Sequence, residues 1–185
     1  PIPDTPDTAP AAEAAAQGPE VPEAEPGDDS YFAGAVFLGD SRTEGFSLYS
    51  GLEEGECLYA VGATVWSVAE EAVWKTESGK VPLLDALETM EAGKVYIMLG
   101  ANELGWPRAE VFQEQYGKVI DRIREDHPDA EVVIQSILPV SAKQQAKGSY
   151  VNNGRISEFN ELLRELAEEK GCPYLDVAEA VTGAD

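Results

Sequence analysis

Five short apolar segments alternate along the sequence with segments whose apolar residues recur at helical spacing. A short, continuous apolar run that is bounded by glycine, proline or polar residues is typical of a parallel strand covered on both faces. Such strands alternating with helices predict a parallel sheet with right-handed crossovers and helices on both sides. The predicted strands are 35–38, 57–61, 95–99, 131–137 and 174–177, and the predicted helices are 65–75, 82–91, 108–125 and 153–170.

This pattern favours a three-layer α/β/α sandwich with a flavodoxin-like sheet of five parallel strands in the order 2-1-3-4-5. The switch point of such a sheet lies between strands 1 and 3, and ligands bind outside the carboxyl ends of the strands. The turns after strands 1, 2 and 3 are therefore where functional residues are expected. Residues 31–185 are assigned to this domain.

The first 30 residues have a different composition from the rest of the chain. They carry eight acidic residues, no Lys or Arg, and seven of the 12 prolines. Such a segment cannot bury enough apolar surface to offset the entropy lost on ordering. We therefore predict a disordered, acidic Pro/Ala-rich linker over residues 1–30.

The charge of the whole chain excludes several classes of partner. With 13 Lys/Arg and 35 Asp/Glu, the formal net charge is −22. A surface this acidic repels phosphate backbones and anionic lipid, so no nucleic-acid partner is expected. No apolar run approaches the roughly 18 residues needed to span a bilayer, so no direct membrane insertion of this chain is expected.

Cysteine and histidine are too scarce for a typical zinc site. The chain has two cysteines and one histidine, and we expect no metal and no cofactor. Cys57 and Cys172 stand at the beginnings of two separate predicted strands, too far apart for a disulfide, and we expect both to be unpaired.

Polar residues follow the first three predicted strands. Ser41 comes after strand 1, Gly62 after strand 2 and Asn102 after strand 3. Because strands 2, 1 and 3 are neighbours in the predicted order, these residues should converge. A hydroxyl nucleophile beside backbone and carboxamide N–H donors is what acyl transfer requires. The alternative role for Asn102 is that of a turn residue.

Other nucleotide and hydrolase motifs are absent. No G-x-G-x-x-G and no G-x-x-x-x-G-K-[ST] occurs, so dinucleotide and P-loop sites are unsupported. The nucleophile elbow G-x-S-x-G also fails, because Thr43 stands where its second glycine would be.

The segments Gly39-Asp40-Ser41, Gly62 and Gly100-x-Asn102 together resemble the SGNH/GDSL hydrolases, over roughly residues 33–177. That resemblance implies the SGNH hydrolase fold, with Ser41 as the nucleophile. It also implies an oxyanion hole made by the Ser41 amide, the Gly62 amide and the Asn102 side chain. Members of the family are mostly esterases and lipases, and many remove acetyl groups from carbohydrates.

The sequence departs from the family pattern at three places. Arg42 replaces the usual Leu, as in bacterial relatives, and Glu103 replaces the Asp that often follows the Asn. The Asp-x-x-His block near the family's C-terminus is missing from this chain, so the base is expected outside this sequence. The single histidine, His127, is expected at the amino edge of the sheet, about a strand's length from Ser41.

Arg42 and Trp106 are candidates for the rim of the substrate site, with packing as the alternative role of Trp106. The resemblance favours a serine esterase that hydrolyses small acyl esters, such as O-acetyl groups on carbohydrate or cell-wall glycan. The alternative is a non-catalytic domain that binds carbohydrate or protein and lacks the catalytic histidine. Because the chain begins at Pro1, we expect a signal or anchor upstream and an extracellular or cell-surface-tethered bacterial protein.

Overall fold

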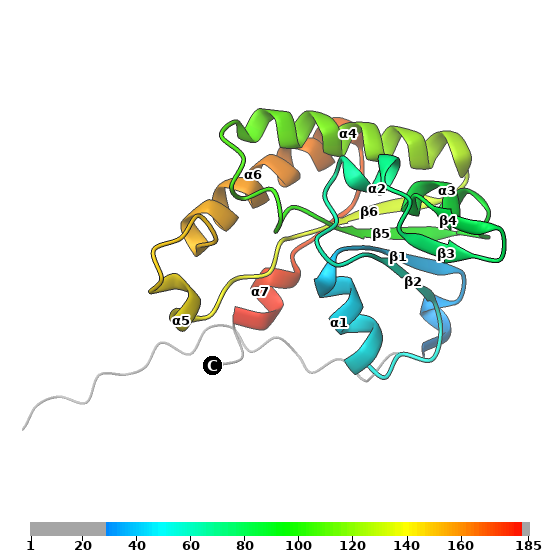
Figure 1. The fold of residues 1–185 in the computed structure, drawn as a ribbon, viewed down its shortest axis with the longest axis horizontal. Coiled ribbons are helices and arrows are strands. Elements are labelled where there is room, and N and C mark those ends of the chain that lie inside the picture. The colour runs from blue at the N-terminus through cyan, green and yellow to red at the C-terminus, as the bar shows by residue number, and fades with distance from the viewer. Residues whose placement is uncertain (1–28, 183–185) are drawn as a thin grey trace, which may run out of the picture.

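The computed structural model describes residues 29–182, which fold as a parallel β-sheet between two layers of helices (Figure 1). The strands of this sheet are hydrogen-bonded in the order β2-β1-β5-β6-β7, and every neighbouring pair is parallel. Counted along the chain within the sheet, this is the predicted order 2-1-3-4-5, and the predicted sandwich fold is confirmed. The strands are β1 (Ala35–Gly39), β2 (Glu56–Tyr59), β5 (Lys94–Met98), β6 (Glu131–Gln135) and β7 (Tyr174–Leu175).

The two faces of the sheet carry different sets of helices (Figure 1). One face is covered by α2 (Ser67–Glu70), α3 (Leu83–Glu88), α4 (Ala109–Asp126) and α6 (Asn153–Lys170). The opposite face carries the α-helices α1 (Ser41–Tyr49) and α7 (Val177–Thr182), and Phe32, from the segment before β1, packs against the same face. Two further short helices are η1 (Asp29–Phe32) before β1 and α5 (Ala142–Gln145) after β6.

The two long helices match their predicted positions because their ends and faces are encoded locally. The Asn152 side chain caps α6 by accepting a hydrogen bond from the Arg155 N–H at 2.9 Å. The buried residues of α4 recur every three or four positions, so that one stripe faces the sheet. These residues are Ala109, Phe112, Tyr116, Gly117, Val119, Ile120 and Ile123.

The prediction of one helix over residues 65–75 is wrong. This segment forms the single turn of α2 and then the strand β3 (Trp74–Thr76), which pairs antiparallel with β4 (Gly79–Val81). Trp and Thr favour strands, and the Thr76 hydroxyl closes the turn by donating to the Gly79 carbonyl at 2.8 Å. The last strand is also shorter than predicted, because Val177 begins α7.

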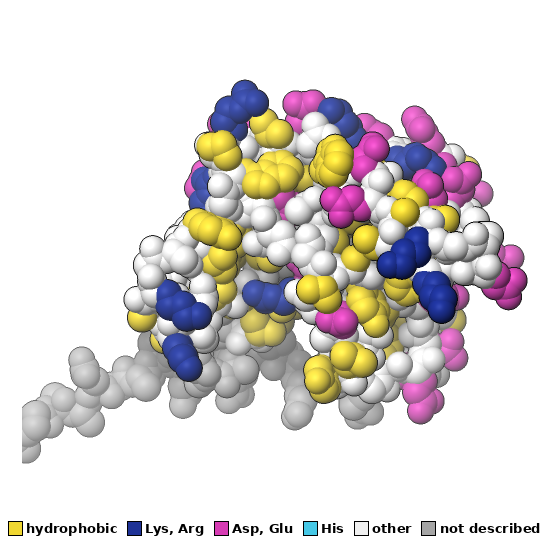
Figure 2. Space-filling model, viewed as in Figure 1, with side chains coloured by type: hydrophobic (Ala, Val, Ile, Leu, Met, Phe, Trp, Pro, Cys, Tyr) yellow, Lys and Arg dark blue, Asp and Glu magenta, His cyan; other side chains and the backbone are white. Residues whose placement is uncertain are grey.

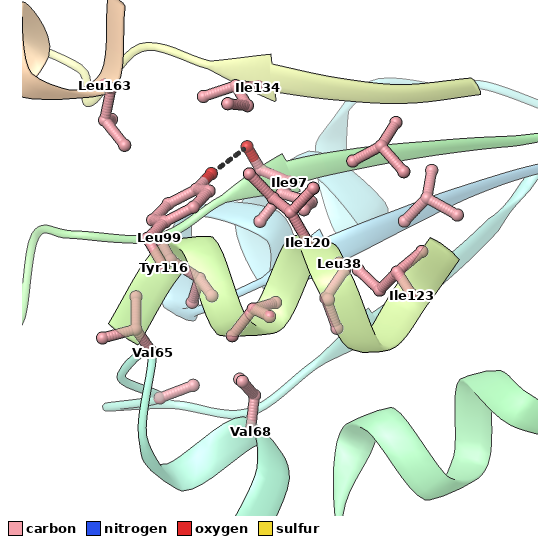
Figure 3. Close-up of a cluster of buried hydrophobic side chains, with 14 of the residues drawn as sticks. Leu38, Val65, Val68, Ile97, Leu99, Tyr116, Ile120, Ile123, Ile134 and Leu163 are labelled. Carbon is pink, nitrogen blue, oxygen red and sulfur yellow. Dashed lines mark hydrogen bonds between the residues drawn. The ribbon is translucent and has the colours of Figure 1, made fainter. Parts of the chain in front are cut away.

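The larger hydrophobic core lies between the sheet and the α2–α3–α4–α6 layer (Figure 3). Leu38, Ile97 and Ile134 of the sheet meet Ile120 of α4 and Leu163 of α6, all fully buried. The Tyr116 hydroxyl lies within this core and donates to the Ile97 carbonyl at 3.2 Å. This layer therefore fixes the sheet and the ends of its strands.

The core on the α1–α7 face is smaller. Its buried members are Ala35, Phe37, Tyr96 and Val133. Thr43 is the only buried residue of α1, and no described residue of α7 is buried. A hollow of about 290 Å³ lies between these helices and the sheet, with mostly apolar lining that includes Phe46, Met98 and Leu138.

Several remaining predictions concern the ends and surface of the domain. The predicted linker falls mostly on residues 1–28, outside the described residues, whereas Asp29 and Ser30 belong to η1.

Cys57 and Cys172 are both free, as predicted. Acidic side chains are scattered over the face that Figure 2 presents. No helix within residues 29–182 is long and apolar enough to cross a membrane.

Candidate active site

The turn between β1 and α1 presents Ser41 at the first position of the helix. Asp40 caps the helix, because its Oδ1 accepts a hydrogen bond from the Arg42 N–H at 2.8 Å. The close packing of this turn needs Gly39, since a Cβ there would lie 2.6 Å from the Met98 carbonyl and collide with the Thr43 side chain. Ser41 is exposed, and within the described chain neither its hydroxyl nor its amide has a hydrogen-bond partner.

The turn after β2 presents a second unpaired amide. It is closed by the Ala63 N–H, which donates to the Ala60 carbonyl at 3.0 Å. Gly62 has a φ of +79°, a conformation that strongly favours glycine. Gly62 is exposed, and its N–H makes no hydrogen bond to any other described residue.

Asn102 joins these two turns from the turn after β5. Its Nδ2 donates to the Ala63 carbonyl at 2.8 Å and to Asp40 Oδ2 at 3.3 Å. Ala63 adjoins Gly62, and Asp40 adjoins Ser41, so these bonds bring the three predicted residues to one place. The carboxyl ends of β2, β1 and β5 thus form one polar site at the predicted edge of the sheet.

The sequence of this site matches a known protein family. The model of the GDSL-like lipase/acylhydrolase family aligns with residues 37–185, which include all three turns. The chain belongs to this family. Membership of the GDSL-like lipases and acylhydrolases supports ester hydrolysis as the general activity of the chain.

Solved structures share the fold of this GDSL-like chain at low sequence identity. A Streptococcus pneumonia protein, provisionally described as a platelet activating factor, is 19% identical with a TM-score of 0.60, over 80% of this chain and 67% of that one. An acetyl xylan esterase is 16% identical with a TM-score of 0.54, over 79% and 78% of the two chains. A GDSL-like lipase from Bacteroides thetaiotaomicron is 14% identical with a TM-score of 0.52, over 80% and 73%. Among curated proteins, no sequence matches significantly.

Two buried carboxyl groups lie in the turns that form the GDSL site. Asp40 is 1% exposed, and burial raises its pKa against the lowering effect of the Arg42 N–H. Glu103 is fully buried, and its Oε1 accepts a hydrogen bond from the Val65 N–H at 2.6 Å. Burial, opposed chiefly by that hydrogen bond, raises the pKa of Glu103 to about 7. The sequence marked Glu103 as a departure from the family pattern and as a candidate alternative base, but it did not predict that Glu103 is buried.

The loop after Glu103 is held by α6. The Arg155 guanidinium donates to the Leu104 carbonyl at 3.1 Å and to the Trp106 carbonyl at 2.7 Å, and it lies 4.7 Å from the Phe159 ring. The sequence analysis missed Arg155, because nothing in its local pattern points to a loop about 50 residues away. This contact fixes the backbone around Trp106 relative to the core.

The two candidate rim residues are both half-buried. Trp106 packs in part against the larger core. Arg42 lines the hollow between α1 and α7. Packing therefore accounts for part of the Trp106 surface, and a substrate contact of either residue stays a prediction.

His127 lies away from the three turns. It caps the C-terminus of α4, where its N–H donates to the Ile123 carbonyl at 2.8 Å. One ring nitrogen, Nε2, lies 3.0 Å from the Leu87 carbonyl at the end of α3. The chain then enters β6 at Glu131, so His127 occupies the amino edge of the sheet, opposite Ser41. In the part of the chain that the structure describes, no group of three His, Cys, Asp or Glu side chains is arranged to hold a metal ion.

Proposed function

We propose that this GDSL-like domain is a serine esterase that hydrolyses small acyl esters. The observation that carries the proposal is the double hydrogen bond of Asn102, which joins the turn of Ser41 to the turn of Gly62. An exposed hydroxyl then lies beside two amides that no other described residue uses. This arrangement suits a nucleophile with donors for a developing oxyanion.

In the proposed reaction the Ser41 Oγ attacks the ester carbonyl, and the carbonyl oxygen becomes an oxyanion. The amides of Ser41 and Gly62 donate to that oxygen, and the helix dipole of α1 favours its negative charge. Asn102 Nδ2 would be the third donor. Its 3.3 Å bond to Asp40 is longer than its 2.8 Å bond to Ala63, so we expect the Asp40 bond to yield to the oxyanion.

A base must accept the Ser41 proton, because a serine hydroxyl is a poor nucleophile without one. A base works within about 3 Å of the proton it takes, and His127 lies at the other edge of the sheet. Glu103 is fully buried and bonded to Val65, whereas Ser41 is exposed. We therefore propose that the base comes from outside the 185 residues.

The proposed substrate class is an O-acetyl ester on carbohydrate or cell-wall glycan. A structurally similar protein is an acetyl xylan esterase. The half-buried Trp106 next to the Asn102 turn offers an aromatic face on which a sugar ring could stack. An extracellular or cell-surface location in a bacterium, which we also propose, would give the domain access to such glycans.

The second candidate is a non-catalytic domain that binds an acylated glycan or a protein. The observation that favours it is the position of the only histidine, at the edge of the sheet opposite Ser41. Such a domain would keep the cluster of N–H donors to recognise an ester carbonyl, without turning the ester over.

Chemical rescue distinguishes the two candidates. Loss of the histidine of a serine triad costs on the order of 10⁶ in kcat, so the 185-residue chain should hydrolyse p-nitrophenyl acetate barely above background. Imidazole added to the solution supplies a general base. It should restore hydrolysis by the wild type beyond its effect on Ser41→Ala, and mass spectrometry should find an acetyl group on the Ser41 peptide.

Each other outcome of this experiment has a definite meaning. Equal rates for the wild type and Ser41→Ala with imidazole, and no acetylated peptide, would contradict the esterase proposal. Binding of acetylated xylan oligosaccharides in calorimetry without turnover would then favour the binding domain. Fast, Ser41-dependent hydrolysis without imidazole would show that a base is already present in the chain or is lent by a second molecule.

A further inference from the structure

We propose that Glu103 is a positioning residue that sets the separation of two of the three oxyanion donors, Gly62 and Asn102, by bridging the turns that carry them. The role of Glu103 rests on the proposed function, because that function identifies Gly62 and Asn102 as oxyanion donors. The bridge itself is a structural claim about two turns. It can be tested without any turnover.

The bridge consists of two adjacent residues that hold two nearby positions of one turn. Asn102 Nδ2 donates to the Ala63 carbonyl at 2.8 Å. Glu103 Oε1 accepts from the Val65 N–H at 2.6 Å. Gly62 directly precedes this doubly held segment. Any change in the length or charge of the Glu103 side chain is therefore transmitted to the Gly62 amide.

The surroundings of Glu103 make the geometry of the bridge depend on whether the Glu103 carboxyl group is protonated. The side chain is fully buried, and its second oxygen, Oε2, has no hydrogen-bond partner in the described part of the chain. Leaving a buried carboxylate oxygen uncompensated is costly, which favours the neutral acid.

The charged and titratable groups around Glu103 add to this preference. Asp40, at the start of α1, acts on Glu103 as a second negative charge and raises its pKa. Tyr116, from α4, is fully buried and bonded to the Ile97 carbonyl, with a pKa raised by burial and by Glu103. Arg155 from α6 uses its guanidinium to donate to the Leu104 and Trp106 carbonyls, in the loop that follows Glu103. With these partners the pKa of Glu103 is about 7, and the bridge changes charge near neutral pH.

Because Glu103 is buried, its side chain cannot contact the substrate directly. A side chain with no exposed surface, already bonded to the Val65 amide, is placed to hold the backbone and not to meet substrate. Its action on the reaction would go through the Gly62 and Asn102 donors. A glutamine at this position keeps a carbonyl acceptor for Val65, whereas a methionine of similar size offers only a weakly accepting thioether sulfur.

The test is an NMR titration of the 185-residue chain labelled with ¹³C-glutamate and ¹⁵N. The Glu103 carboxyl signal, identified by its loss in Glu103→Gln, should titrate near pH 7, and ordinary glutamates near about 4.3. The amide signals of Gly62 and Val65 and the side-chain amide of Asn102 should move with the same midpoint. In Glu103→Gln they should keep their low-pH positions throughout.

Two further variants complete the experiment. Glu103→Met should speed hydrogen exchange of the Val65 amide about tenfold or more and displace the Gly62 and Asn102 signals. Glu114→Gln removes an exposed carboxylate that pairs with Lys118, and should leave all these signals in place. Gly62 and Asn102 signals that stay fixed while Glu103 titrates would overturn the proposal, and so would an ordinary midpoint for Glu103. If Glu103→Met does not fold, the titration of the wild type against Glu103→Gln still decides.

Discussion

Replacing Glu103 by glutamine should remove a pH dependence of stability that this one buried carboxyl imposes. Burial raises its pKa from 4.5 to about 7 in the folded chain. A group whose pKa is raised on folding contributes its full stability below the unfolded pKa, and that contribution is lost as the pH rises through the folded pKa. The difference between 4.5 and about 7, at about 1.4 kcal/mol per pH unit, corresponds to about 3.5 kcal/mol in total, of which about 3 kcal/mol is lost between about pH 4.5 and about pH 8.

Urea unfolding, followed by tryptophan fluorescence from about pH 4.5 to about pH 8, measures this effect. The free energy of unfolding of the wild type, minus that of Glu103→Gln, should fall by about 3 kcal/mol over this range. Taking the difference cancels the pH-dependent contributions that the other carboxylates of this acidic chain make to the free energy of unfolding.

The matched control is Glu114→Gln. Lys118 lowers the pKa of Glu114, so its contribution is already complete above pH 4.5 and the corresponding difference should stay flat. Parallel stability curves for the wild type and Glu103→Gln would refute the reasoning, because they would mean that Glu103 ionises in the folded chain as easily as in the unfolded one.

Three other predictions follow from the site and its supports. In any form with Ser41-dependent turnover, Asn102→Ala should lower kcat about 10²–10³-fold with little change in KM, and a near-normal kcat would leave Asn102 as a turn residue only. His127→Ala should not change hydrolysis of p-nitrophenyl acetate, because His127 caps α4 at the opposite edge of the sheet, and a clear loss of rate would contradict that placement. Gly39→Ala should destabilise the domain by about 1–3 kcal/mol in urea unfolding, because the added Cβ meets Thr43 and the Met98 carbonyl, and an unchanged midpoint would show that the turn relaxes freely.

The sheet and the position of the site could be predicted because their signals are local. Each strand is a short apolar run, and the order of parallel strands limits which turns can meet. The hairpin β3–β4 was missed because a short stretch of mixed apolar and polar residues such as 73–76 fits a helix or a strand until its partner is known. The end of β7 was missed because Asp176 Oδ1 accepts from the Glu179 N–H and starts α7 there.

The supports of the site could not be predicted, because they depend on contacts between distant segments. Glu103 is buried by the turn at Val65, 38 residues earlier, and Arg155 reaches the Leu104 carbonyl, 51 residues earlier. A glutamate or an arginine in a polar stretch ordinarily lies on the surface. Their roles become visible only when the sheet brings its strand ends together.

The helices on the two faces of the sheet bury different amounts of apolar surface. The site therefore draws its residues from two regions of different thermal stability. Ser41 begins α1, which buries only Thr43, whereas the Asn102 turn continues into a loop that Arg155 anchors to α6. Segments with few buried apolar contacts open at lower free energy than the rest of a domain. On warming, α1 should therefore detach while the α4–α6 layer stays folded. The nucleophile would then leave the Gly62 and Asn102 donors at a temperature below the melting point of the sheet.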